Sequence, residues 1–463
     1  VQEPGKLYRV LRMSSLFFRA SALGALCAVS LAAQSPESKP PDPGAAAGGL
    51  TLRGIGPAIM SGRIADVEVH PKDRSTWYVA AGSGGVWKTT DAGTTFTPVF
   101  DDQPSYSIGE ITIDPTRPEV VWVGTGENVS GRHVGWGDGV YRSRDAGRTW
   151  QRMGLAKSEH IGRILVDPRD GDVVLVAAEG PLWAAGGDRG VYRTTDGGAT
   201  WTPVLQIDEH TGVTDLEFDP SNPDVVYAAA YQRRRHVWGF LGGAPGSGLW
   251  KSTDNGRTWR EVTSGLPKGD MGKIGLAVTP ADPALVYATI EAGDEERGFY
   301  RSRDKGESWE KRNAYISGGT GPHYYQEIEA SPTDPGLVYQ MDVFIQVTRD
   351  GGRTFGLLET GHDKHSDNHA LWIDPANGKH LLVGTDAGTA TLRLEPTDLA
   401  VADGILHGGA IATCVDTASW YAARAASPGE WVVSAAEDGT VRLWDRRSGK
   451  EFRSFSVMNP VSL

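Results

Sequence analysis

Histidine, carboxylate, guanidinium and aromatic side chains gather in a few segments of this 463-residue chain. Imidazole and carboxylate groups transfer protons, guanidinium groups bind anions, and aromatic rings stack on the apolar faces of sugars and peptides. A solvated loop surface, with its aromatic rings packed into neighbouring strands, is the alternative for the same residues. We expect ten of them to bind a ligand: Arg63, Arg132, His133, Trp136, His160, Arg234, His236, Trp238, His323 and Tyr325.

Three carboxylates are candidates for catalysis: Glu127, Asp215 and Glu327. A glycosidase needs two carboxyl groups about 5 to 9.5 Å apart, one acting as the acid and the other as base or nucleophile. Asp215 and Glu327 each lie five residues before a proline at the end of an alternating apolar strand, as Asp66 and Glu110 also do. A structural role in that strand is therefore the alternative to catalysis.

The segment GHDKHSDNH contains His365, Asp367 and His369, whose side chains are of the kinds that bind divalent transition metals. On an extended strand these alternate residues would face one side but would spread over roughly 13 Å, at about 3.3 Å per residue. One ion would contact all three only if the loop curled. We expect no cofactor, and hydrogen bonding between neighbouring strands is the alternative to a divalent metal here.

A repeat determines which elements must position these residues. The aromatic ring of each unit can fill the interior, the Gly permits a left-handed backbone, and the Asp carboxylate can accept backbone N–H groups in a tight turn. We therefore assign the six aspartates a structural role and no catalytic one. The repeated pattern is S/T-x-D-x-G-x-S/T-W/F, and its aspartates follow each other at steps of 54, 51, 58, 50 and 46 residues: Asp91, Asp145, Asp196, Asp254, Asp304 and Asp350.

A second repeat lies between these segments and joins an alternating apolar strand, a proline turn and a Val- and Tyr-rich strand, as in LEFDPSNPDVVYAA. Units of about 50 residues with four short strands are typical of propeller blades, because a blade has two apolar faces and needs a neighbour on each. The sequence therefore predicts an all-β propeller over residues 51–395, with a solenoid as the alternative. Seven prolines mark seven blades: Pro71, Pro115, Pro168, Pro220, Pro280, Pro332 and Pro375.

The topology of a propeller predicts where the candidate residues lie. Loops that precede the innermost strands and loops that join the middle strands meet at one end of the central channel. The ten candidate ligand-binding residues and Glu127 fall in these loops, so we expect them to share one face of the ring.

Several stretches resemble a known family, among them GPAIMSGRIADVEVHP, GSGGVWKTTDAGTTF, TGENVSGRHVGWGDGVYRS and HSDNHALWIDP. They resemble exported bacterial BNR (Asp-box) repeat proteins usually described as glycosyl hydrolases, and the propeller of sortilin-type receptors. Asp boxes also recur in sialidases and xyloglucanases. The resemblance covers roughly residues 51–388 and implies a propeller that either binds or cleaves its ligand.

The resemblance does not supply a catalytic set. Xyloglucanase-like propellers carry a catalytic Asp in a segment that resembles residues 82–88, where this chain has Ser83. A serine cannot replace a carboxylate base. The Tyr, Glu, Asp and three Arg that a sialidase requires are not identifiable by motif.

The two ends differ from the repeats. From Met13, a cationic Arg19 and a short apolar run that ends at Ala32 and Ala33 are typical of a signal peptide, and the run is shorter than the roughly 20 residues of a spanning helix. We read residues 1–33 as an upstream extension and signal peptide, and the Pro-, Gly- and Ala-rich residues 34–50 as a disordered linker. We expect a secreted or periplasmic protein without a membrane span after cleavage.

Residues 396–463 are predicted to form a WD-repeat-like tail. The stretch WVVSAAEDGTVRLWDRRSGKEFRSF resembles one WD repeat, with Asp438 and Gly439 in a hairpin turn. This tail could add an eighth, closing blade. A fragment left by a truncated or chimeric gene is the alternative.

Composition narrows the partners. The chain has 46 basic and 58 acidic residues, a net charge of −12, and no basic run longer than the three arginines 233–235, which argues against nucleic acid. Two function hypotheses remain. One is an extracytoplasmic propeller that binds peptide, protein or glycan ligands on its loop-rich face without catalysis, and the other is a glycoside hydrolase acting on an extracellular polysaccharide.

Overall fold

The computed structural model describes residues 63–318, 321–325, 327–358, 364–394, 400–402, 431–435, 440–445 and 451–456. Every regular element within these ranges is a β-strand. The predicted signal peptide and linker lie outside the described residues, as do residues 403–430. The described part of the chain contains no helix with the length and hydropathy that a membrane crossing requires.

The strands form seven antiparallel sheets, each built from consecutive strands. In chain order they are β1 (Ile64–Val69), β2 (Trp77–Ala81), β3 (Gly85–Thr89) and β4 (Thr97–Pro98); β5 (Ile108–Ile113), β6 (Val121–Thr125), β7 (Val140–Ser143) and β8 (Gln151–Gly154); β9 (Ile161–Val166), β10 (Val174–Ala178), β11 (Gly190–Thr194) and β12 (Thr202–Leu205); β13 (Thr211–Asp219), β14 (Asn222–His236), β16 (Gly248–Ser252) and β17 (Arg260–Val262), with β15 (Gly239–Gly242) paired to β14; β18 (Ile274–Val278), β19 (Val286–Ile290), β20 (Gly298–Ser302) and β21 (Glu310–Asn313); β22 (Ile328–Ala330), β23 (Val338–Gln340), β24 (Gln346–Thr348) and β25 (Gly356–Leu357); and β26 (Asn368–Ile373), β27 (His380–Thr385), β28 (Gly388–Leu394) and β29 (Ala400–Ala402).

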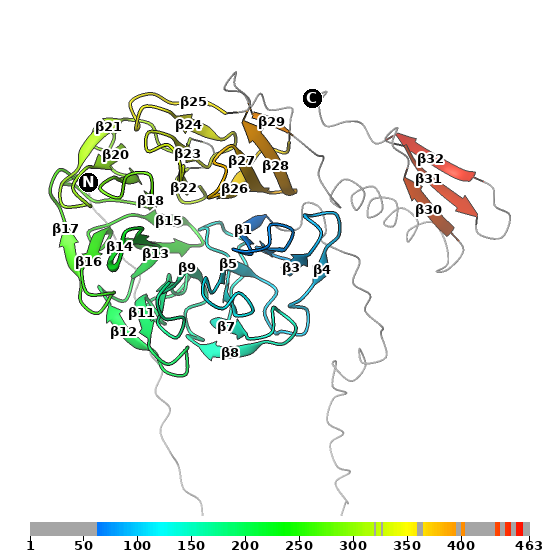
Figure 1. Ribbon diagram of the computed structural model, residues 1–463, viewed down its shortest axis with the longest axis horizontal. Coiled ribbons are helices and arrows are strands. Elements are labelled where there is room, and N and C mark those ends of the chain that lie inside the picture. The colour runs from blue at the N-terminus through cyan, green and yellow to red at the C-terminus, as the bar shows by residue number, and fades with distance from the viewer. Residues whose placement is uncertain are drawn as a thin grey trace, which may run out of the picture. The chain divides into compact units, whose positions relative to one another are not determined.

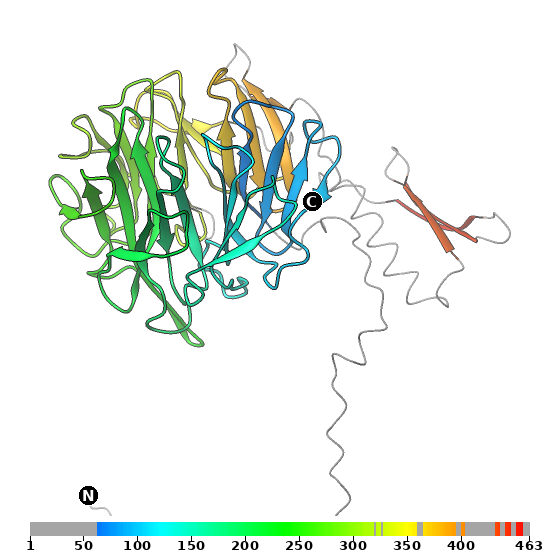
Figure 2. The same ribbon diagram turned by 60° about the horizontal axis from the view of Figure 1, so that its bottom comes forward.

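The seven sheets are blades arranged in a ring (Figures 1 and 2), and residues of their innermost strands line a central channel. The first strand of each blade is the innermost one, and β1 lies beside both β5 and β26, so the first and seventh blades are direct neighbours. The predicted seven-bladed propeller is confirmed, and the solenoid alternative is wrong. The seventh blade ends at β29, slightly beyond the predicted boundary at residue 395.

The tail contains a separate three-stranded antiparallel sheet of β30 (Trp431–Ala435), β31 (Thr440–Asp445) and β32 (Glu451–Ser456). These strands pair with each other, in agreement with the hairpin expected for the WD-like stretch. The residues of the expected hairpin turn itself, 436–439, lie outside the described ranges. An eighth, closing blade stays a prediction.

The hydrophobic core lies between blades rather than within one. Tyr78 and Val86 of the first blade, for example, pack against Ile111 and Val121 of the second, and all four side chains are buried. This arrangement follows from the two apolar faces of each blade, since only a neighbouring blade can remove them from water.

Each repeated aspartate closes the turn between the third and fourth strands of its blade. In the second blade, Asp145 Oδ1 accepts hydrogen bonds from the Ser143 hydroxyl and the Thr149 N–H, and Oδ2 accepts one from the Thr149 hydroxyl. Burial opposes ionisation, but these hydrogen bonds lower the pKa of Asp145 to about 2. The hydrogen bond from the N–H four residues later recurs in all six turns.

The innermost strands aim charged side chains into the channel. In β1, β5, β9, β13 and β26 the pairing register with the second strand shifts by one residue, which is the signature of a β-bulge. The residue after the shift in the first four of these strands lines the central cavity: Asp66, Glu110, Arg163 and Asp215.

Candidate functional site

Side chains from the first, second and sixth blades meet at one end of the channel, which we call the loop face. Arg63, just before β1, forms an ion pair with the buried carboxylate of Glu127, which follows β6. The guanidinium carbon of Arg63 lies 4.8 Å from the centre of the Tyr324 ring, and an Arg63 nitrogen lies 3.3 Å from Nε2 of His133. The predicted convergence of loops from different blades therefore occurs around Arg63.

His160 belongs to the same network but is not accessible to a ligand. Its side chain is 2% exposed, and its Nδ1 lies 2.8 Å from the carbonyl oxygen of Glu127. Burial, together with the positive charge of Arg233, lowers the pKa of His160 to about 3. The imidazole is therefore neutral at physiological pH and holds the Glu127 backbone in place.

The three proposed metal ligands do not form a common site. The two carboxylate oxygens of Asp367 accept hydrogen bonds from the hydroxyls of Tyr325 and Ser366, whereas His369 Nε2 lies 3.0 Å from Asp386 Oδ1. The Nδ1 atom of His365 lies 2.7 Å from the backbone oxygen of Ser366. Among the described residues, no three His, Cys, Asp or Glu side chains are arranged to hold a metal ion.

Tyr325 is wholly buried, so its ring cannot stack on a ligand as we expected. The ring lies parallel to that of His369, with the two centres 5.1 Å apart. The Tyr325 side chain therefore packs the loop before β22 against the start of β26, where His369 lies.

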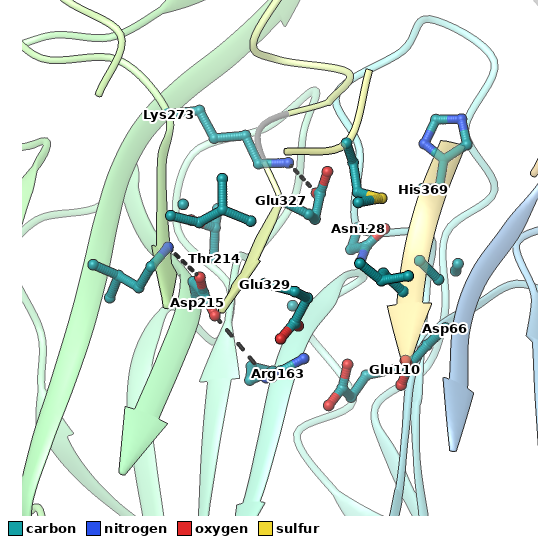
Figure 3. Close-up of a pocket in the computed structure, with 18 of the residues that line it drawn as sticks. Asp66, Glu110, Asn128, Arg163, Thr214, Asp215, Lys273, Glu327, Glu329 and His369 are labelled. Carbon is teal, nitrogen blue, oxygen red and sulfur yellow. Dashed lines mark hydrogen bonds and ion pairs between the residues drawn. The ribbon is translucent and has the colours of Figure 1, made fainter. Parts of the chain in front are cut away.

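Two of the predicted catalytic carboxylates, Asp215 and Glu327, line the central channel (Figure 3). Glu327 receives a hydrogen bond of 2.7 Å from the Lys273 ammonium group, and Asp215 lies 4.0 Å from Arg163. Burial raises the pKa of Asp215 to about 6, against the opposing effect of Arg163. The cavity between them measures about 60 Å³, which is room for a few water molecules and not for a sugar ring.

The channel carboxylates have a structural task. The innermost strand of each blade has one edge without a strand partner, and its N–H groups must find acceptors. Asp215 Oδ2 accepts a hydrogen bond from the Leu276 N–H of the next blade, and Asp66 Oδ2 accepts one from the Ile111 N–H in the same way. The structural alternative therefore accounts for the position of Asp215.

A groove of about 580 Å³ lies on the loop face over the second and third blades. Three aromatic side chains line it and are exposed: Tyr106 before β5, Trp136 between β6 and β7, and Trp183 between β10 and β11. Arg132 and His133 line the same groove and are also exposed. Carbohydrate-binding surfaces usually combine exposed aromatic rings with polar groups.

Two carboxylates line this groove, Asp138 and Glu159. Burial raises the pKa of Glu159, although the charge of Arg189 acts in the opposite direction. Asp138 accepts a hydrogen bond of 2.8 Å from the Tyr141 hydroxyl. A carboxyl group with a raised pKa beside a carboxylate in a polar setting is the pairing that acid–base hydrolysis requires.

Glu159 has an uncommon backbone conformation. Its φ is +62°, in the left-handed region, and its carbonyl oxygen accepts a 2.7 Å hydrogen bond from the N–H of Gly137. Gly126 lies directly against that carbonyl, so a side chain there would collide with it. Non-glycine residues in this region are strained and tend to lie at functional sites.

The remaining candidates lie on the long hairpin of β14 and β15. The ring of His236 stacks on that of Trp238 with centres 4.6 Å apart, and Trp238 at the tip is 84% exposed. Arg234 is half-buried on β14, and His323 contacts the hairpin through the ring of Phe240, 5.0 Å away.

The structure thus separates the candidates into two groups. Arg132, His133, Trp136 and Trp238 are exposed on the loop face, whereas Arg63, Glu127, His160 and Tyr325 form the buried network beneath it. The structure adds four residues that were not expected from the sequence: Asp138, Glu159, Trp183 and Asp386. Trp183 could have been found, because it occupies the loop between the second and third strands of its blade, as Trp136 does in the preceding one.

Comparison with known families agrees with the fold. The model described as sortilin, neurotensin receptor 3, matches residues 138–297, and the WD domain, G-beta repeat model matches residues 407–445. The first match covers the third and fourth blades completely, together with β7 and β8 of the second blade and β18 and β19 of the fifth, and the second match falls in the tail.

Curated relatives of similar sequence are named xyloglucanases. One from Hypocrea jecorina is 23% identical over 359 residues, which is 69% of this chain and 40% of the relative. Another from Paenibacillus sp is 26% identical over 282 residues, 52% of this chain and 25% of the relative. The chain therefore spans less than half the length of these curated relatives.

Solved structures show the same fold. The GH74 xyloglucanase from Xanthomonas campestris superposes with a TM-score of 0.56 at 18% identity, covering 83% of this chain and 58% of that one. The GH74 enzyme of Niastella koreensis gives 0.54 at 15% identity, with 84% and 58% covered. By its repeats and its fold, the chain is an Asp-box β-propeller, similar over residues 138–297 to the sortilin family model and more widely to proteins named xyloglucanases.

Proposed function

We propose that this propeller binds and hydrolyses an extracellular polysaccharide in the groove over its second and third blades. The observation that carries the proposal is the combination of three exposed aromatic rings with Asp138 and Glu159 in one groove of about 580 Å³. The relatives named xyloglucanases support a branched glucan as the first substrate to test. The signal peptide expected before residue 34 supports a substrate outside the cell.

Glu159 is the proposed general acid. Because burial raises its pKa, a larger fraction of this carboxyl stays protonated near neutral pH than of an exposed one, and it can give its proton to the glycosidic oxygen as the bond to the anomeric carbon breaks. Asp138 is the proposed base, which takes a proton from the water that attacks the anomeric carbon. The aromatic rings of Trp136 and Trp183 hold sugar units on either side by stacking.

The experiment is a reducing-end assay on a panel of neutral and acidic polysaccharides that includes xyloglucan. We expect Glu159→Gln to lower kcat by about 10²- to 10⁴-fold with little change in KM, the range for loss of an acid catalyst. Trp136→Ala should raise KM instead. The matched control is Glu209→Gln, because the Glu209 side chain is 71% exposed and lies outside the groove lining, and it should retain full activity.

Binding without cleavage is the second candidate function. The match of residues 138–297 to a receptor family model favours it, and the same groove would then hold a peptide or glycan. Polysaccharide or peptide binding that Trp136→Ala abolishes, with no reducing ends released from any substrate, would reject the hydrolase and leave this candidate.

A further inference from the structure

A buried arginine without a carboxylate partner binds the loop that leads into the groove. Arg235 on β14 is 7% exposed, and its Nε donates a 2.7 Å hydrogen bond to the carbonyl oxygen of Ser130. Its guanidinium lies over the Phe240 ring at 4.3 Å. Within the described residues, no Asp or Glu pairs with it. A buried charge is costly unless it is paired, so this position favours an anion from outside the chain.

A second unpaired cation faces the same place. Arg132 lies two residues after Ser130, is exposed, and lines the groove; no carboxylate of the described ranges pairs with it either. Because Arg235 bonds to the Ser130 carbonyl, two residues before Arg132, the two arginines are neighbours. Burial lowers the pKa of Arg235, and the charge of Arg132 acts in the same direction. Neighbouring guanidinium groups are stabilised by an anion that binds between them.

His323 also contacts this part of the hairpin. Its ring lies 5.0 Å from that of Phe240, the ring that Arg235 covers, and its carbonyl oxygen accepts a 3.0 Å hydrogen bond from the N–H of Ser130. Burial lowers the pKa of His323, and Arg235 and Lys273 act in the same direction. A lowered pKa favours the neutral imidazole, which can still donate one ring N–H to an anion.

We propose that Arg132, Arg235 and His323 bind the carboxylate or sulfate group of an acidic polysaccharide whose neighbouring sugar stacks on Trp136. This inference rests on the proposed function, since it names the substrate class of the same groove. A glycan is favoured over an acidic peptide because the exposed rings of Tyr106, Trp136 and Trp183 line the groove that Arg132 borders. Guanidinium groups bind carboxylate and sulfate alike through paired N–H donors, so uronate and sulfated chains share this chemistry.

The test measures binding of the full chain by calorimetry to polygalacturonate, carrageenan, xyloglucan and poly-glutamate at low and high salt. We expect at least one acidic polysaccharide to bind about 10-fold more tightly than xyloglucan, with the difference reduced at high salt. The uronate and sulfate arms identify which group is preferred. Arg132→Gln should weaken acidic binding by about 10-fold, and by more than it weakens xyloglucan binding.

Arg148→Gln is the matched control, because Arg148 is also exposed but lies on the Asp-box turn of the second blade. Arg235→Lys keeps the positive charge but loses the paired N–H donors of the guanidinium group. The folded variant should therefore bind acidic polysaccharides more weakly than wild type. Equal affinity for acidic and neutral glycans, or an unaffected Arg132→Gln, would overturn the inference while hydrolysis of neutral glycan still supports the proposed function. Binding of poly-glutamate alone through Arg132 would overturn it in favour of a peptide site. If an acidic glycan binds through Arg132 but is never cleaved, the proposed hydrolysis is wrong and the anion-binding inference stands.

Discussion

Arg193 on the third strand of the third blade reaches into the Asp-box turn of the fourth blade and bonds to Asn255 twice. Its Nε donates to the Asn255 carbonyl oxygen and its Nη2 to the side-chain Oδ1, both at 2.9 Å. Asn255 has a φ of +60°, a conformation in which its carbonyl is turned toward the neighbouring blade. The same bond from a basic residue before the Ser or Thr of one box to the next box is made by Lys88, Arg142 and Lys251.

This bond predicts that the Asp-box turns tie blades together. Arg193→Met should lower the free energy of unfolding by about 1 to 3 kcal/mol, because the substitution leaves two buried acceptors of Asn255 without their charged donor. Chemical denaturation measures the change. Arg303→Gln is the control: this side chain is 68% exposed beside another Asp-box turn, and its replacement should cost less than about 0.5 kcal/mol. Equal losses in the two variants would contradict the prediction.

The Asp-box carboxylates predict a loss of stability in acid. Hydrogen bonds from Ser308 and Ser302 outweigh burial and lower the pKa of Asp304 to about 2, against about 3.9 in an unfolded chain. The stability that Asp304 supplies is therefore complete above pH 4 and is lost as pH falls toward 2. Asp304→Ala should be less stable than wild type by about 1 to 3 kcal/mol at pH 7, and the gap should narrow below pH 4.

Denaturation curves at pH 7, 4 and 2.5 test this prediction. Asp294→Ala, in which the replaced side chain is 91% exposed, is the control and should differ little from wild type at any of these values. A gap for Asp304→Ala that stays constant from pH 7 to 2.5 would show that the carboxylate is not the group that titrates.

The carboxyl groups that line the channel should lower the unfolding free energy as pH rises above 4. Burial raises the pKa of Glu329 to about 8, although the charge of Arg163 acts in the opposite direction. A carboxyl whose pKa is raised on folding supplies most stability below its unfolded pKa of about 4.3, and that stability is lost as pH rises toward 8. Glu329→Gln should flatten the decline in unfolding free energy between pH 4 and 8 by about 1 kcal/mol.

The matched control for Glu329→Gln is Glu119→Gln. The Glu119 side chain is exposed between β5 and β6 of the second blade. Its variant should show the wild-type pH dependence. If Glu329→Gln also follows the wild-type curve, the channel carboxyls do not exchange protons with folding.

The left-handed backbone of Glu159 predicts that Gly126 cannot be replaced. A Cβ at Gly126 would lie 1.7 Å from the carbonyl oxygen of Glu159, and Gly126 itself has a φ of +85°. Gly126→Ala should therefore destabilise the protein by more than about 1 kcal/mol and reduce polysaccharide binding, because the loop that carries Glu159 must move. Gly293→Ala is the control, since no atom lies within 4 Å of a Cβ there. Wild-type thermal stability in Gly126→Ala would show that the loop relaxes freely.

The sequence alone determined the fold. The six Asp-box segments and seven proline turns fix a four-strand unit, and a unit with two apolar faces can only be stable between neighbours. The number of blades and the convergence of loops on one face followed from this repeat. The residues that gather there, such as Arg63, Glu127 and His133, come from different blades and meet as expected.

Only the tertiary structure decided which of these side chains are available to a ligand. Exposure depends on what the loops of other blades cover, and no local pattern reports it: His160 and Tyr325 are buried by contacts from residues at least 33 positions away, whereas Trp136 and Trp238 remain exposed. The same holds for Asp215, whose partner is an N–H on the next innermost strand. The backbone of Glu159 is set by Gly126 and Gly137 of another blade, so its place in the groove could be seen only once the blades were packed together.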